Sequence, residues 1–214
     1  KNIAGTAHRK YRHNFINIYP ANGYRSTAII LLSKNFQIPP RYLMYYTRST
    51  SNSQIIKYKI VGGGAYEDNL KQFINEYNLS ENVEIINNLG VKNGREIVKE
   101  QLRNSDIFIL CSYQTTRGTK EGTPVVLMEA QSCGLPCIAT THAGIPEIVI
   151  NGETGILVKE KCPEEICQAI LFLYQNKEIV ESMKIQARQH IIENFNQSVQ
   201  MDKLCFEYNK FIRG

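Results

Sequence analysis

Residues 1–66 contain no aspartate or glutamate, although they carry ten lysine and arginine residues. The rest of the chain carries fifteen basic and twenty acidic residues, so the net charge of +5 divides into +10 and −5. A basic segment of this kind occurs in proteins that bind nucleic acid or an anionic membrane surface. Its basic residues are scattered along the segment, however, which favours the alternative that it binds no such partner. We therefore expect no nucleic-acid partner.

The chain also lacks a run of about 18 apolar residues, the length that a transmembrane helix needs. Its first six residues, Lys1 to Thr6, lack the apolar core of a signal peptide. No two of the six cysteines are spaced as CxxC, so reduced, buried thiols are expected in place of a disulfide framework or a zinc site. These features together predict a cytoplasmic protein whose membrane contact, if any, is peripheral at the inner face.

From about residue 55 onward, short apolar runs alternate with amphipathic segments. The predicted strands are 55–61, 83–86, 107–111, 135–140 and 155–158. The predicted helices are 65–78, 94–104, one starting near 123, 146–150, 163–175, 177–194 and 197–212. This alternation predicts an α/β fold, a Rossmann-like open parallel sheet with helices on both faces. Ligands of such sheets bind beyond the carboxyl ends of the strands.

Residues 1–54 give weaker signals. Short apolar runs at 28–32 and 42–46 have the length of strands, and Pro39 with Pro40 separates them. We assign no function to this basic segment, and the predicted Rossmann-like domain spans residues 55–214.

The stretch from Lys120 to Ala130 contains the strongest candidates for ligand-binding residues. Its two carboxylates, Glu121 and Glu129, are eight positions apart. Thr123 is a suitable N-cap and Pro124 suits the first helical position, so a largely buried helix is predicted to begin near 123. Glu121 then lies in the loop before the helix, and Glu129 lies inside the helix, where a buried carboxylate needs a hydrogen-bond donor. The free N–H groups at the helix start form a binding site for phosphate.

Two carboxylates that flank such a helix start suit a ligand with phosphates in the middle and a diol at each end. A nucleotide-sugar has this form, because each carboxylate can accept hydrogen bonds from two neighbouring hydroxyls. On this hypothesis Glu121 binds sugar hydroxyls, Glu129 binds the ribose, and the amides of Gly122, Thr123 and Val125 face the diphosphate. The alternative is a solvated loop residue at Glu121 and a buried acid with protein partners at Glu129.

Other residues carry weaker signals. Gly62, Gly63 and Gly64 follow a predicted strand, where they permit either close approach to a phosphate or a plain tight turn. Arg117 and Lys120 either neutralise phosphate charge or remain solvated loop cations. His142, after another predicted strand, is a candidate proton donor or hydrogen-bonding contact, although a lone loop histidine is more often neither.

Several motifs in this order resemble the nucleotide-sugar-binding, carboxyl-terminal half of family 4 retaining glycosyltransferases, which have the GT-B fold. The matching stretches are 106–112, 121–130, 134–140, 144–149 and 151–158. The resemblance covers about residues 56–195. It includes the family's pair of glutamates separated by seven residues, here Glu121 and Glu129.

The resemblance implies transfer of a sugar from a nucleoside diphosphate, UDP or GDP, to a glycan or lipid-linked acceptor, with retention at the anomeric carbon. It implies no cofactor and no metal site. It assigns Glu121 to the donor sugar as the catalytic residue and Glu129 to the ribose. The segment from Gly122 to Val125, which includes Pro124, is assigned to the donor, as are Gly62 and Gly63.

The chain also departs from the family pattern. Family members carry an amino-terminal acceptor domain, for which this chain has no room, so we expect that a separate domain supplies it. In the family, a first strand is followed by an Arg and a Lys for the diphosphate and then by a helix. Here Arg48 lies only twelve residues before Ile60, too close for that helix, so no residue receives this role. Two functions therefore remain open: the donor-binding half of a glycosyltransferase, or a catalytically incomplete nucleotide-sugar-binding module.

Overall fold

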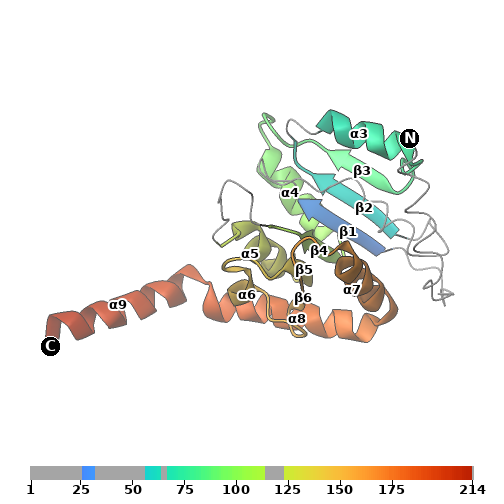
Figure 1. Cartoon of the computed structure of the whole chain (residues 1–214). Coiled ribbons are helices and arrows are strands. Elements are labelled where there is room, and N and C mark those ends of the chain that lie inside the picture. Colours follow the sequence, from blue (N-terminus) through green and yellow to red (C-terminus); the bar gives the residue numbers. More distant parts are fainter. Residues whose placement is uncertain (1–25, 32–55, 64–66, 114–122, 214) are drawn as a thin grey trace.

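The computed structural model describes residues 26–31, 56–63, 67–113 and 123–213 (Figure 1). Its strands are β1 (Ser26–Leu31), β2 (Ile56–Val61), β3 (Val83–Ile86), β4 (Ile107–Leu110), β5 (Cys137–Thr140) and β6 (Gly155–Val158). Its helices are α3 (Glu67–Glu76), α4 (Gly94–Arg103), α5 (Val125–Ser132), α6 (Ile145–Ile148), α7 (Pro163–Gln175), α8 (Lys177–Asn194) and α9 (Gln197–Arg213). Every strand and helix predicted from residue 55 onward is present, with ends shifted by at most three residues.

The six strands form one sheet in the order β3-β2-β1-β4-β5-β6, and all neighbouring strands are parallel. This is the strand order of a doubly wound, Rossmann-type sheet. The order reverses between β1 and β4, because the chain builds the sheet outward from β1 in one direction and then in the other. The predicted fold class is therefore confirmed.

The sheet begins earlier than the boundary expected at residue 55. Strand β1 lies in the middle of the sheet and pairs with both β2 and β4, so the segment 1–54 supplies a central strand. The apolar run at 28–32 indicated this strand, but no recognisable helix pattern follows it, and an isolated apolar run does not reveal its partners. The second apolar run, at 42–46, lies outside the described residues.

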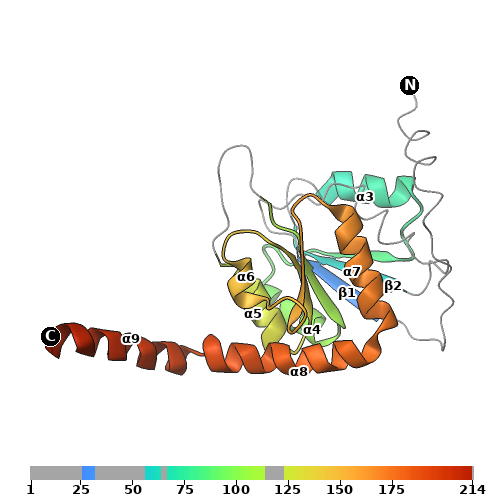
Figure 2. The same cartoon turned by 60° about the horizontal axis from the view of Figure 1, so that its bottom comes forward.

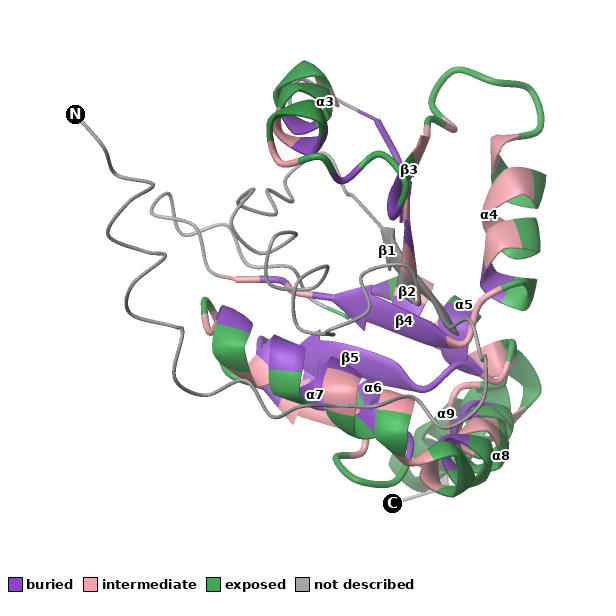
Figure 3. Ribbon diagram, turned by 90° about the vertical axis from the view of Figure 1, so that its right-hand side faces the viewer, coloured by how far each residue is buried: buried purple, intermediate pink, exposed green. Residues whose placement is uncertain are grey.

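Side chains from the two faces of the sheet form two separate cores. Ile107 and Ile109 of β4 point into one core, and Phe108 and Leu110 point into the other, as expected for a strand buried on both faces. Helices α3 and α7 cover the first face, whereas α4, α5 and α6 cover the second. Figure 3 shows β4 and β5 as buried strands inside this arrangement. The helix positions confirm that both faces are covered.

Helix α8 extends from one core to the other. Met183 packs in the first core, and Ile191, two turns later, packs in the second. Helix α9 then leaves the body of the protein (Figure 2), and its residues from 200 to 212 are all exposed. Its exposed apolar side chains are Met201, Leu204, Phe206, Tyr208, Phe211 and Ile212. Helix α9 thus adds nothing to either core.

A chain that ends at Asn196 is therefore expected to fold as well as the full chain. Because α9 buries almost no apolar surface, its removal should change the free energy of unfolding by less than about 1 kcal/mol, a shift in Tm of about 2–4 °C. Differential scanning calorimetry of both chains measures this directly. A much lower Tm for the shortened chain would mean that α9 packs against the domain.

The cysteines differ in burial, and all six are free thiols. Cys137 and Cys167 are buried as expected, and burial raises the pKa of the Cys137 thiol well above its usual range. Cys133 and Cys205, however, are exposed, so the expectation of buried thiols is wrong for these two. Their apolar neighbours misled the prediction because a helix places adjacent residues on different faces. In the part of the chain that the structure describes, no helix is long and apolar enough to cross a membrane.

Candidate functional site

The strand order reverses between β1 and β4, because the chain continues from β1 towards one edge of the sheet and from β4 towards the other. In open α/β sheets, ligands bind beyond the carboxyl ends of the strands at such a point. The connection after β4 leads through Cys111, Ser112 and Tyr113 towards α5. Its central part, residues 114–122, lies outside the described residues, and so do Glu121, Gly122, Arg117 and Lys120.

The connection after β1 corrects one sequence expectation. Residues 32–55 separate β1 from β2, which is longer than the dozen residues that a crossover between parallel strands needs. Counting the space for that helix from Arg48 was therefore wrong, because the first strand ends at Leu31. Lys34 is the first basic residue after β1, and the sequence analysis missed it. Both Lys34 and Arg48 lie outside the described residues.

Helix α5 begins two residues later than predicted. Pro124 is the residue before the first turn, with ψ of 109° in the extended region, and Thr123 is exposed and outside the helix. Pro124 provides no side-chain cap, and no other described residue is recorded as capping this helix start. The first N–H groups of an uncapped helix lack intrahelical partners and carry the positive end of the helix dipole. An anion is therefore a suitable partner for the start of α5.

Glu129 was expected to be buried, and the structure contradicts this. Glu129 is exposed, and so is Val125 one turn earlier on the same face, with 62% of its surface accessible. The helix packs on the sheet through Leu127 and Ala130, both fully buried. Because α5 is apolar on nearly every side, the sequence did not show which face points outward. Glu129 thus presents its carboxylate to solvent near the start of α5.

The inward face of α5 carries a residue that the sequence analysis missed. Gln131 is fully buried, and its Nε2 donates a hydrogen bond to Thr154 Oγ1 at 3.0 Å. The same Thr154 hydroxyl accepts a bond from the backbone N–H of Ile150 at 2.8 Å. These bonds fix α5 against the loop before β6. A glutamine beside an apolar run gives no sequence signal for this role.

The glycines after β2 are explained by local packing. Gly62 has a φ of 147°, and a Cβ at Gly63 would lie only 2.7 Å from Asn87 Oδ1. Asn87 in turn donates from Nδ2 to Glu67 Oε2 at 2.7 Å, at the start of α3. The tight-turn alternative therefore accounts for Gly63, whereas a contact with the donor stays a prediction. Gly64 lies outside the described residues.

A cleft opens at the carboxyl end of β3, near the start of α4. Its volume is about 500 Å³. The lining residues are Asn88, Val91, Lys92, Asn93, Gly94, Arg95 and Glu96. Helices α4 and α5 cover the same face of the sheet, and both begin at its carboxyl edge. The cleft therefore belongs to the same edge and the same side of the molecule as the start of α5.

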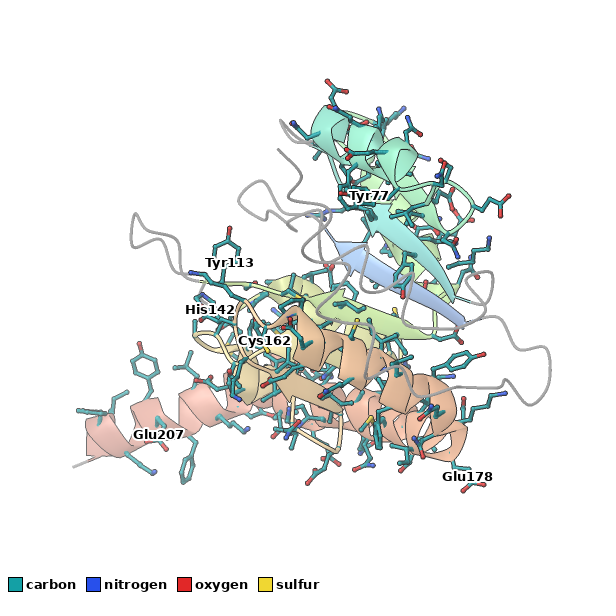
Figure 4. The ribbon with its side chains drawn as sticks, turned by 45° about the vertical axis from the view of Figure 1, so that its right-hand side comes forward. Tyr77, Tyr113, His142, Cys162, Glu178 and Glu207 are labelled. Carbon is teal, nitrogen blue, oxygen red and sulfur yellow. The ribbon has the colours of Figure 1, made fainter. Side chains whose placement is uncertain are left out.

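His142 also lies at this edge, after β5, where Figure 4 shows it near Tyr113. Its side chain is only 4% exposed, and its Nδ1 lies 2.7 Å from Glu160 Oε1. The sequence analysis did not find Glu160 because the two residues come from different connections. Within the described residues, no group of three His, Cys, Asp or Glu side chains is placed to hold a metal ion.

The sequence and the fold both have known relatives. The family model described as "Glycosyl transferases group 1" matches residues 43–190. A Salmonella typhimurium protein assigned as a colanic acid biosynthesis glycosyltransferase, WcaL, is 37% identical over 142 residues, which are 66% of this chain and 34% of that protein. The amylovoran biosynthesis glycosyltransferase AmsK of Erwinia amylovora is 34% identical over 149 residues, 70% of this chain and 36% of that protein.

Solved structures agree on the fold. Anabaena HepE in complex with UDP superposes with a TM-score of 0.69 at 16% identity, over 87% of this chain and 49% of that one. The carboxyl-terminal domain of a group 1 glycosyltransferase from Francisella tularensis superposes with a TM-score of 0.65 at 16% identity, over 85% of this chain and 97% of that domain. The chain thus spans about a third of the length of its curated relatives and corresponds to a single GT-B half. It belongs to the group 1 (family 4) glycosyltransferases, of which it contains the carboxyl-terminal half.

Proposed function

We propose that this chain is the donor-binding half of a retaining glycosyltransferase that uses a UDP- or GDP-sugar. The acceptor is a glycan or a lipid-linked sugar, as the polysaccharide-biosynthesis relatives suggest. A separate amino-terminal domain supplies the acceptor site, and the protein acts in the cytoplasm, at most peripherally bound to the inner membrane face. The single observation that carries the proposal is the uncapped start of α5 beside the reversal of strand order, with an exposed glutamate on the helix.

Each part of the donor has a partner in this arrangement. The diphosphate lies at the start of α5, where the amides of Thr123 and Val125 join that of Gly122, with Pro124 shaping the turn. Glu129 accepts hydrogen bonds from the two ribose hydroxyls. In the described residues its side chain has no ion pair or hydrogen bond that would compete with a ligand. Glu121 contacts the transferred sugar and acts as the catalytic residue.

The nucleobase then extends into the cleft at the start of α4. The cleft lies at the same edge of the sheet and on the same face as α5, with β2 and β1 between β3 and β4. Val91, 44% exposed, offers apolar surface to the flat base, and Asn88 offers amide groups for its polar edge.

Replacing Val91 by aspartate is expected to weaken UDP binding about tenfold, because a charged side chain replaces apolar contact with the base. The matched control is Leu89→Asp, since Leu89 is similarly exposed (46%) but does not line the cleft. Isothermal titration calorimetry measures both variants. Equal affinities of Val91→Asp and Leu89→Asp for UDP would mean that the base does not bind in this cleft.

Calorimetric titration of the whole chain with UDP and with GDP tests the proposed function itself. We expect saturable binding of one of them at one site per chain. A folded chain that binds neither at about 1 mM, an affinity of only about 4 kcal/mol, would contradict the proposal.

The second candidate is a nucleotide-sugar-binding module without transfer activity. An assay for UDP release from UDP-glucose separates the two functions. The enzyme half is expected to release UDP when its acceptor domain is present, whereas a binding module binds the donor and never turns it over.

A further inference from the structure

One buried and one partly buried polar contact join the carboxyl ends of β4, β5 and β6. The hydroxyl of Thr140, at the end of β5, donates to the backbone oxygen of Ser112 at 2.5 Å, and both residues are at most 3% exposed. Two residues later, His142 Nδ1 meets Glu160 Oε1 at 2.7 Å, across the connection that follows β6. Side chains therefore connect three neighbouring strands beyond the point where their backbone pairing ends.

The backbone around the His142–Glu160 pair is unusual. Ala143, directly after His142, has a φ of +46°, and Lys161, directly after Glu160, has a φ of +57°. Non-glycine residues avoid this left-handed region and adopt it only where the surrounding structure imposes it. The backbone N–H of His142 also donates to Thr140 O at 2.8 Å, so the turn after β5 is tightly defined.

The imidazole of His142 is not fully satisfied. Its Nε2 is buried and has no hydrogen-bond partner among the residues that the structure describes. A buried polar atom without a partner costs free energy, and an apolar side chain of similar shape would avoid that cost. His142 therefore lowers the stability of the fold relative to an apolar residue at this position. Residues that lower stability in this way are typical of functional sites.

These contacts act on the segment that leads to the donor site. Ser112 and Tyr113 are the first residues after Cys111 in the connection from β4 to α5. Thr140 holds the carbonyl of Ser112, and Lys161 Nζ lies 5.2 Å from the centre of the Tyr113 ring, over its face. The connections after β5 and β6 therefore hold the beginning of the β4–α5 connection on the side away from β1.

We propose that Thr140 and the His142–Glu160 pair are positioning residues for donor binding. They hold Ser112 and Tyr113, the described start of the β4–α5 connection, at the carboxyl edge of the sheet, where the donor is proposed to bind. They do so without touching the donor. This inference rests on the proposed function, because it assumes that the nucleotide-sugar binds at this edge of the sheet.

The test compares Thr140→Val with Thr140→Ser in the full chain. Valine has the shape of threonine but cannot donate to Ser112, whereas serine keeps the hydroxyl. We expect the Kd for UDP-glucose to rise about tenfold in Thr140→Val and to stay within about twofold of wild type in Thr140→Ser. Thr141→Val is the matched control, since the Thr141 hydroxyl donates to Val158 on β6 and not to the β4–α5 connection. The Kd of Thr141→Val for UDP-glucose should be that of the wild-type chain.

Affinity is measured well below the unfolding transition, so that a merely structural role would lower Tm and leave the Kd of the folded protein unchanged. Glu160→Gln is a second variant, at a side chain that is 30% exposed, and covers the case in which Thr140→Val fails to fold. We expect Glu160→Gln to weaken UDP-glucose binding several-fold.

Wild-type affinity in both Thr140→Val and Glu160→Gln would overturn the inference, provided that the wild-type chain binds UDP-glucose. Absence of binding by the folded wild-type chain would instead contradict the proposed function. The two failures are therefore distinguishable.

Discussion

Replacing Glu129 by alanine is expected to weaken binding of UDP by roughly 1–3 kcal/mol, a loss of about 5- to 150-fold in affinity. The physical reason is the loss of a carboxylate that accepts hydrogen bonds from both ribose hydroxyls, since bonds to a charged group are stronger than neutral ones. Because Glu129 is exposed, the substitution should leave the free energy of unfolding nearly unchanged. Isothermal titration calorimetry gives the affinity, and thermal unfolding gives the stability.

The control for Glu129 is Glu178→Ala, which removes another exposed glutamate, from the first turn of α8. Figure 4 shows Glu178 far from the carboxyl edge of the sheet. The affinity of the Glu178→Ala variant for UDP should match that of the wild-type chain. If Glu129→Ala also binds UDP like the wild-type chain while remaining folded, the ribose is not held by this carboxylate.

The largest effect on stability is expected for Gly155→Ala. A Cβ at Gly155 would lie 2.0 Å from the backbone oxygen of Cys137, and this oxygen belongs to a fully buried strand that is itself paired on both sides. Neither strand can move without breaking the sheet, so we expect a loss of more than about 3 kcal/mol. This is a large fraction of the 5–15 kcal/mol that stabilises a typical domain. Urea unfolding followed by circular dichroism measures the loss.

Gly152→Ala is the matched control for that substitution. Gly152 has a φ of +83°, but a Cβ there would meet nothing within 4 Å. Only the left-handed backbone then opposes the alanine, at a cost of about 1 kcal/mol. A Gly155→Ala variant as stable as Gly152→Ala would show that β5 and β6 can separate locally, in conflict with their described pairing.

The sequence predicted the fold well where apolar patterns are unambiguous. The continuous apolar run of β4 and the similar run of β5 are each too short for a helix, and each is bounded by loop residues, so the prediction of buried parallel strands was secure. Strand β1 was harder, since its place in the middle of the sheet depends on pairing with strands far along the chain. Local pattern does not encode such pairing, and the boundary expected at residue 55 was misplaced for this reason.

The candidate site was predicted in part. The sequence located the start of α5 to within two residues and identified the carboxyl edge of the sheet as the ligand side. It failed on the burial of Glu129, because an apolar helix shows no polar stripe from which the outward face can be deduced. It also missed Gln131 and Glu160, whose roles depend on partners in other connections. The assignment of Glu121 and Gly122 to the donor remains a prediction.

The most direct measurement is a crystal structure of this chain with UDP-glucose. We predict that the diphosphate lies at the start of α5, with the ribose on Glu129, the base towards Val91, and the glucose beside Glu121. A nucleotide bound elsewhere, or at α5 with Glu129 turned away from the ribose, would contradict the central claim.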